Sequence, residues 1–137
     1  MPNKRNMQAM IDAARKDLKT QKQSLLDQAM GLEAGDKAKF WGIYEGYQKE
    51  LDKIWDVRLA NVKKYADNYT TMTDEVADQL AQSALNNERQ LTALQTTYYA
   101  AYKKAMGAKL AARWLQAETA ITSLSMLQLL SNLPLLQ

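Results

Sequence analysis

The chain has 137 residues, enough for a single domain with a modest hydrophobic core. Its 18 basic and 15 acidic side chains give a formal net charge of +3, too small and too mixed in sign for the concentrated basic face of a nucleic-acid-binding protein. Because the chain has neither Cys nor His, it lacks the usual nucleophile–base pairs and the ligands that zinc and haem prefer, so we expect no enzyme activity, no metal and no cofactor.

Only five Gly and two Pro residues interrupt a sequence rich in Ala, Leu, Gln and Lys, which predicts long helices. We expect an all-α fold, an elongated antiparallel helical hairpin or bundle of about four helices, two of them long, in one domain over residues 1–137. No apolar signal segment follows Met1, which fits either a cytosolic protein or a mature exported one. The predicted helices cover residues 5–30, 36–67, 74–105 and 108–131, with an apolar tail at 132–137.

The first predicted helix, 5–30, is the most basic part of the chain and ends at Gly31. We interpret its basic side chains as a solvated face; the alternative is a patch for an anionic partner. Its apolar residues recur at spacings of three and four, which predicts one buried side. These residues are Met7, Met10, Ile11, Ala14, Leu18, Leu25 and Met30.

The second predicted helix begins with Asp36 as its N-cap. Its apolar stripe follows a nearly seven-residue repeat, typical of helices packed at shallow angles. Arg58 lies on that stripe. Either its aliphatic part covers apolar surface while its guanidinium reaches water, or it is half of a buried ion pair. Gly42 and Gly46 indicate either close approach of another helix or tolerated surface positions. The stripe consists of Phe40, Tyr44, Tyr47, Leu51, Ile54, Trp55, Val62 and Tyr65.

The third predicted helix begins after Thr73, a good N-cap, with Asp74 and Glu75 on its first turn. Asn87 lies on its apolar seam, where a polar residue can fix the register of packing. The two middle helices would each be about 45 Å long, so we expect an elongated molecule. The seam consists of Ala77, Leu80, Ala84, Leu91, Leu94, Tyr98, Ala101 and Ala105.

The fourth predicted helix starts after Gly107 and has stopped by Pro134. Its first part has one apolar stripe: Leu110, Trp114, Ala117, Ile121 and Leu124. Its last part is apolar all round yet too short to span a bilayer. We expect this part to pack within the monomer or a dimer; the alternative is contact with a membrane surface or a client protein. Its apolar residues are Leu124, Met126, Leu127, Leu129, Leu130, Leu133, Leu135 and Leu136.

Aromatic residues crowd the second helix and the region around Gly107. Most such residues form core, but neighbours in sequence such as Phe40 and Trp41, or Tyr98 and Tyr99, cannot all face inward. The surplus predicts an exposed patch. The candidate residues for binding a partner or client are Trp41, Tyr44, Trp55, Tyr99, Tyr102, Trp114, Leu129 and Leu133.

Two segments around the Gly breaks, residues 30–41 and 105–116, resemble the Leu-Thr-x-x-Gln element of the small periplasmic Spy/CpxP-like proteins. The run Phe40-Trp41-x-x-Tyr44-x-x-Tyr47-x-x-x-Leu51 and the segment Arg113-Trp114-Leu115-Gln116-Ala117-Glu118 also resemble this group. The resemblance implies a bent helical hairpin that dimerises into a cradle in the periplasm. It further implies ATP-independent chaperone activity of the holdase type, without the His-based metal sensing of some members.

Three functional hypotheses therefore remain open. The first is a periplasmic holdase or envelope-stress adaptor that binds unfolded proteins, in which adaptable Met side chains would serve promiscuous contacts. The second is a non-enzymatic helical protein that binds one specific envelope partner. The third is a bundle that holds a small apolar ligand among its aromatic residues.

Overall fold

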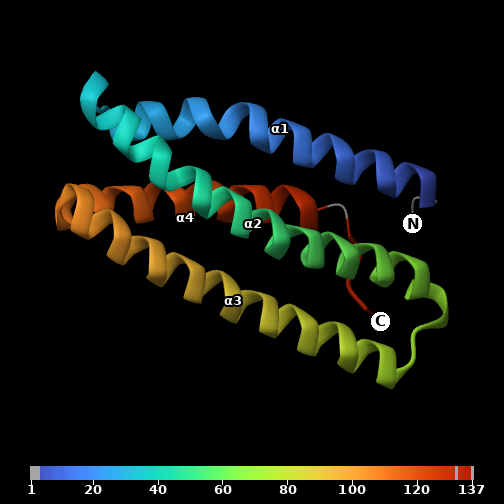
Figure 1. Ribbon diagram of the computed structural model, residues 1–137. Coiled ribbons are helices and arrows are strands. Elements are labelled where there is room, and N and C mark those ends of the chain that lie inside the picture. The colour runs from blue at the N-terminus through green and yellow to red at the C-terminus, as the bar shows by residue number, and fades with distance from the viewer. Residues whose placement is uncertain (1–3, 132, 137) are drawn as a thin grey trace.

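The protein is all-helical in the computed structural model, which describes residues 4–131 and 133–136, with the side chains of residues 4–8, 10, 11, 13, 14, 18 and 19 left out. The predicted all-α class, with four helices of which two are long, is confirmed, and the described residues include no strand. The helices are α1 (Lys4–Met30), α2 (Ala34–Asn68), α3 (Asp74–Met106) and α4 (Ala108–Leu130), with a short 3₁₀ turn, η1 (Tyr69–Thr71), after α2 (Figure 1).

Successive helices reverse direction along the bundle (Figure 1). Each helix packs against two others: α1 against α2 and α4, α2 against α3, and α3 against α4. The four helices therefore form a closed ring around a shared core, as in four-helix bundles. The dimer, and the cradle that it would form, stay predictions.

Glycine and a threonine cap set the helix ends. Gly31 ends α1 in the left-handed region, with φ of +57°, and Gly107 separates α3 from α4 with φ of +91°. Both values are ones that side chains with a Cβ rarely adopt. The Thr73 hydroxyl accepts a hydrogen bond from the Val76 amide at 3.2 Å, which confirms Thr73 as the N-cap of α3.

The predicted N-cap of α2 is wrong. Asp36 lies inside the first turn of α2, because the helix begins at Ala34 after Glu33, whose backbone is extended. The Glu33 side chain makes no capping hydrogen bond. Asp36 still places negative charge near the positive end of the helix dipole. It therefore stabilises the start of α2 from within the first turn and not as the N-cap.

The predicted apolar stripe of α2 is buried, except that Tyr65 is only half-buried. On α1 the prediction is displaced by one residue: Leu25 is 42% exposed, whereas Leu26 is fully buried. Lys22, Leu26 and Met30, four residues apart, form the buried face of that half of the helix. The side chains of the other α1 residues on the predicted stripe, apart from Met30, lie outside the described residues: Met7, Met10, Ile11, Ala14 and Leu18.

The fourth helix is too short to cover its neighbours. It has 23 residues and α3 has 33, so the paired α2 and α3 extend past it by ten residues, about 15 Å. The C-terminal segment 133–136 crosses this uncovered stretch. There the Tyr65 hydroxyl donates to the Pro134 carbonyl and the Tyr69 hydroxyl donates to the Leu135 carbonyl at 3.5 Å. The bundle is therefore closed by helices at one end and by an irregular strap at the other.

Candidate functional site

Five aromatic rings from three helices pack together at the end of the bundle near Gly31 and Gly107. Trp114 of α4 contacts two of the other rings, at 5.1 Å from that of Tyr47 and 4.7 Å from that of Tyr102. Phe40 stacks 5.1 Å from Tyr102, and the Tyr102 hydroxyl donates to the Phe40 carbonyl at 3.2 Å. We call Phe40, Tyr44, Tyr47, Tyr102 and Trp114 the aromatic cluster; all five are buried.

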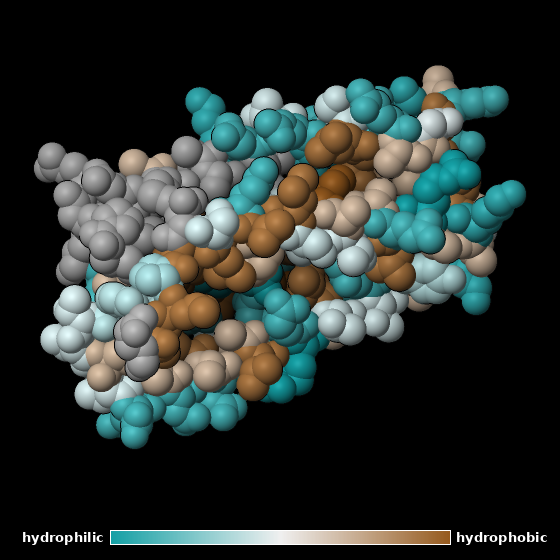
Figure 2. All heavy atoms as spheres, turned by 180° about the vertical axis from the view of Figure 1, so that it is seen from behind, coloured by the Kyte–Doolittle hydropathy of each residue, from teal (hydrophilic) through white to brown (hydrophobic). Residues whose placement is uncertain are grey.

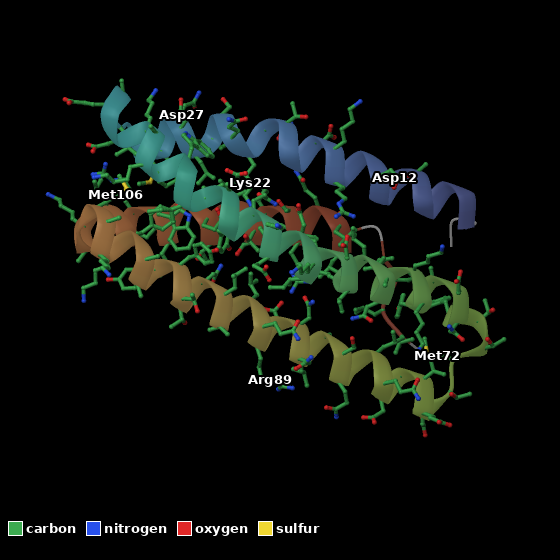
Figure 3. The ribbon with its side chains drawn as sticks, in the orientation of Figure 1. Asp12, Lys22, Asp27, Met72, Arg89 and Met106 are labelled. Atoms are coloured by element: carbon green, nitrogen blue, oxygen red, sulfur yellow. The ribbon has the colours of Figure 1, made fainter. Side chains whose placement is uncertain are left out.

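A buried ion pair lies against this cluster. Lys22 of α1 places its Nζ 2.8 Å from Glu118 Oε1 of α4, and the two side chains are 5% and 0% exposed. Figure 3 shows Lys22 on the side of α1 that is turned toward the other helices. The Tyr44 hydroxyl donates to Glu118 Oε2 at 2.9 Å, and Lys22 also donates to Gln48 Oε1 at 3.3 Å. The pair thereby links α1, α2 and α4.

The surroundings keep the tyrosines of this site neutral. Burial raises the pKa of Tyr44 above its ordinary value of 10.0, and the negative charge of Glu118 raises it further. The same two causes, in the same order, raise the pKa of Tyr47 and of Tyr102. A phenolate would place a second negative charge beside the Glu118 carboxylate, which is unfavourable. The phenols therefore act here as hydrogen-bond donors and ring surfaces.

The geometry of the ion pair favours a structural role. Lys22 and Glu118 neutralise each other inside the bundle, and the Lys22 ammonium also lies 5.4 Å from the centre of the Tyr44 ring. A buried pair of this kind adds little net stability over apolar residues of the same size, but it penalises any packing that separates the two charges. We infer that it fixes how α1 docks on α4.

Sequence reasoning missed both members of this pair. The sequence places Lys22 among the basic residues of a predicted solvated face, and Glu118 at the end of the Arg113–Glu118 segment. The signal was helical spacing: Lys22 stands four residues before Leu26, and Glu118 four residues after Trp114, each in line with a buried residue.

A second set of polar residues lies further along α2 and α3. Arg58 of α2 is buried and pairs with the more exposed Glu88 of α3, with its guanidinium 5.4 Å from the centre of the Trp55 ring. Burial lowers the pKa of Arg58, and the Glu88 carboxylate opposes that shift. Arg58 is therefore paired and buried, as one of its two predicted roles required, but the pair is only half buried because the Glu88 side chain is 61% exposed. Asn87, 1% exposed, donates through Nδ2 to the Ile54 carbonyl at 2.9 Å.

An apolar cavity of about 450 Å³ lies beside these polar residues, where α4 gives way to the C-terminal strap. Arg58 and Val62 of α2, Ala84 and Asn87 of α3, and Leu130 of α4 are among its lining residues. Leu133, Pro134 and Leu135 of the strap complete its wall. Its volume falls in the range of about 300–1,000 Å³ that is common for small-molecule sites.

Leucines around this cavity face solvent. Leu127 is 66% exposed and Leu135 is 85% exposed. Figure 2 shows apolar residues as a brown band across the face of the molecule opposite to that of Figure 1, with a hollow within it. We call the exposed leucines of α3, of the second half of α4 and of the strap the leucine-rich end; they are Leu85, Leu124, Leu127, Leu130, Leu135 and Leu136.

Most of the residues predicted to bind a partner are buried in the monomer. Tyr44, Tyr102 and Trp114 belong to the aromatic cluster, whereas Trp55 and Leu129 lie elsewhere in the core. The three that retain part of their surface are Trp41, Tyr99 and Leu133. The structure brings Trp41 next to the aromatic cluster, with its ring 5.0 Å from that of Phe40, and places Leu133 at the cavity. Their role in binding stays a prediction.

Neither metal-binding nor membrane-spanning features emerge from the described part of the chain. No group of three acidic side chains there converges as metal coordination would require. No helix in this part combines the length and the apolar character needed to cross a bilayer.

Comparison with protein-family models, with curated proteins and with solved structures finds no match. The similarity to Spy/CpxP-like proteins therefore stays a prediction from short motifs.

Proposed function

We propose that this protein is a non-enzymatic, ATP-independent holdase that binds apolar segments of unfolded proteins at its leucine-rich end, in the periplasm. The observation that carries the proposal is the exposure of large leucines on α3, the second half of α4 and the strap, three of which, Leu85, Leu130 and Leu135, line the cavity. Folded monomers rarely expose contiguous apolar patches of this kind unless another molecule covers them.

The rest of the bundle supports this proposal as a rigid scaffold. The aromatic cluster and the Lys22–Glu118 pair hold the opposite end closed. An unfolded client would then gain contact with Leu127 and its neighbours without prying apart the core. The proposal thus places client contact on the exposed leucines, with the partly exposed Leu133 beside them, and gives the buried aromatics a structural role.

Light scattering of a chemically denatured client, diluted into buffer without ATP, tests the proposal. Wild type should suppress aggregation near stoichiometric amounts, and the double variant Leu124→Gln/Leu127→Gln should lose most of that effect. The matched control is Leu25→Gln, which removes a leucine of 42% exposure from α1. No suppression by wild type at several-fold excess would refute the proposal, as would equal loss in the control.

A second candidate function is binding of one specific helical partner. Leu124, Leu127 and Leu130 recur every third residue along α4, and the last two line a groove of about 430 Å³ between α3 and α4. Such a ridge beside a groove suits an amphipathic partner helix, including one from a second copy of this chain. Sedimentation equilibrium tests the dimer, and Leu127→Gln should dissociate it. Suppression restricted to one client among several unrelated ones would favour this candidate over the holdase.

A further inference from the structure

We propose that the cavity behind the C-terminal strap is a binding site for a small neutral amphiphile, an aliphatic molecule that carries one hydroxyl or amide N–H donor. Asn87 would accept the hydrogen bond from that donor, and the leucine side chains of α3, α4 and the strap would enclose the aliphatic part.

The unpaired oxygen of Asn87 is the first observation. Asn87 lines the cavity and is 1% exposed, and its Oδ1 is a buried acceptor without a hydrogen-bond partner among the described residues. The orientation of this amide is fixed, because the Ile54 carbonyl can only accept and therefore requires Nδ2 on its side. A buried acceptor left unpaired destabilises the protein, and a donor on a ligand would remove that cost.

The pairing of the other polar groups in the wall defines the charge of the ligand. Arg58 is neutralised by Glu88, so a charged head group would gain no free counter-charge there. Asn61 exchanges two hydrogen bonds with Ser83, at 2.8 and 3.1 Å. The Tyr65 hydroxyl is used by the strap. The wall therefore favours a ligand that carries one hydrogen-bond donor and no net charge.

The strap provides a route by which a ligand can enter the cavity. Only about four residues of irregular chain, 133–136, close this side of the cavity, and Leu135 is 85% exposed. Their described polar links to α2 and η1 are the two tyrosine hydroxyls. Moving this segment opens the cavity without breaking a helix.

This site adjoins the surface proposed for clients, because Leu85, Leu130 and Leu135 belong to both, but each also has residues of its own. Leu124 and Leu127 face solvent and do not line the cavity, whereas Ala84 and Asn87 line it. A variant can therefore remove one activity and leave the other. Failure of the amphiphile site leaves the holdase proposal intact, and the reverse also holds.

Calorimetry with 1-octanol and n-octane as probes tests the proposal on the whole protein. We expect 1-octanol to bind wild type with one-to-one stoichiometry. Ala84→Leu fills the cavity with a good helix former and should abolish binding of both probes. Ala81→Leu is the matched control, because Ala81 lies on the same helix and is exposed as Ala84 is, but does not line the cavity; this variant should bind as wild type does.

Asn87→Leu isolates the hydrogen bond. The ratio of the octanol to the octane dissociation constant should rise about fivefold relative to wild type, the effect of one neutral hydrogen bond. Because both probes are measured on each variant, a change in cavity shape cancels from the ratio. An unchanged ratio, or 1-octanol binding that survives Ala84→Leu, would overturn the proposal. Absence of octanol binding to a folded wild type would overturn it as well.

Discussion

Where α1 meets α2, the interior of the bundle is filled by buried aromatic rings and a buried ion pair, whereas where α4 stops short of α3, leucines face solvent around a cavity. Both ends are built from the same kind of amphipathic helix. They differ because four helices meet at the first end, whereas at the second α4 stops and a short strap takes its place. The difference in helix length thus separates a region whose side chains are buried from one whose leucines stay exposed.

The largest expected effect is on the ion pair of the closed end. Glu118→Ala should lower the free energy of unfolding by about 3–5 kcal/mol, because it leaves the Lys22 ammonium buried without a counter-charge. Urea denaturation followed by circular dichroism measures this. The double variant Lys22→Met/Glu118→Leu should regain most of the loss, since apolar residues of similar size replace such pairs at little cost.

The control for that experiment is the exposed pair between Arg15 and Asp56, whose charged atoms lie 2.7 Å apart. Asp56→Ala should change the free energy of unfolding by less than about 1 kcal/mol, because water screens exposed pairs. Equal losses from Glu118→Ala and Asp56→Ala would contradict the assignment of a special role to the buried pair.

Leucines should respond according to the end at which they lie. Leu26→Ala removes a fully buried side chain and should lower the free energy of unfolding by about 2–5 kcal/mol. Leu127→Ala removes one that is 66% exposed and should change it by no more than about 0.5 kcal/mol. Thermal denaturation at one protein concentration compares them. A large loss in Leu127→Ala would mean that its side chain is covered in solution, as a dimer would require.

Alkaline pH should destabilise the closed end through its tyrosines. Tyr44, Tyr47 and Tyr102 have raised pKa values when folded, so above about pH 10 the unfolded chain releases their protons while the folded protein keeps them. The free energy of unfolding should therefore fall by up to about 1.4 kcal/mol per pH unit for each of the three. Urea titrations at pH 9, 10 and 11 measure how steeply the free energy of unfolding falls with pH. Tyr44→Phe should make this fall less steep by the contribution of one tyrosine. An identical slope in Tyr44→Phe would exclude Tyr44 as a contributor.

The smallest expected effect compares two glycines of α2. A Cβ on Gly42 would meet nothing within 4 Å, so Gly42→Ala should stabilise the protein by about 1 kcal/mol through helix propensity. A Cβ on Gly46 would lie 2.6 Å from the Tyr98 hydroxyl, so Gly46→Ala must push that ring away from Tyr47. We expect Gly46→Ala to be about 1 kcal/mol less stable than Gly42→Ala in thermal denaturation. Equal stabilities would mean that Tyr98 moves freely.

Periodicity predicted much of the fold. The stripe of α2 from Phe40 to Val62 is buried as expected, and Thr73 and the two glycines at helix ends act as their chemistry suggests. On α1 the apolar spacing led to Leu25 instead of Leu26, because the true face includes a lysine that a hydrophobicity pattern counts as exposed.

The candidate site was harder to predict, for a physical reason. The pairing of Lys22 with Glu118 joins residues on the first and last helices, and no local pattern states which distant helix will lie opposite. The cavity depends on the difference in length between α3 and α4, which the predicted bounds of residues 74–105 and 108–131 contained. Its polar acceptor, Asn87, was predicted to fix packing register, and its link to Ile54 fits that role.

The ring of helices also has a consequence for the order in which the protein assembles. Contacts of α2 with α3, and of α3 with α4, join neighbours in the chain, whereas α1 reaches α4 only through distant pairs such as Arg113 with the Met30 carbonyl. Closing so long a loop costs more entropy than forming a local hairpin. We expect α2–α4 to form first and α1 to dock last, so stopped-flow kinetics should show Glu118→Ala accelerating unfolding more than it slows folding.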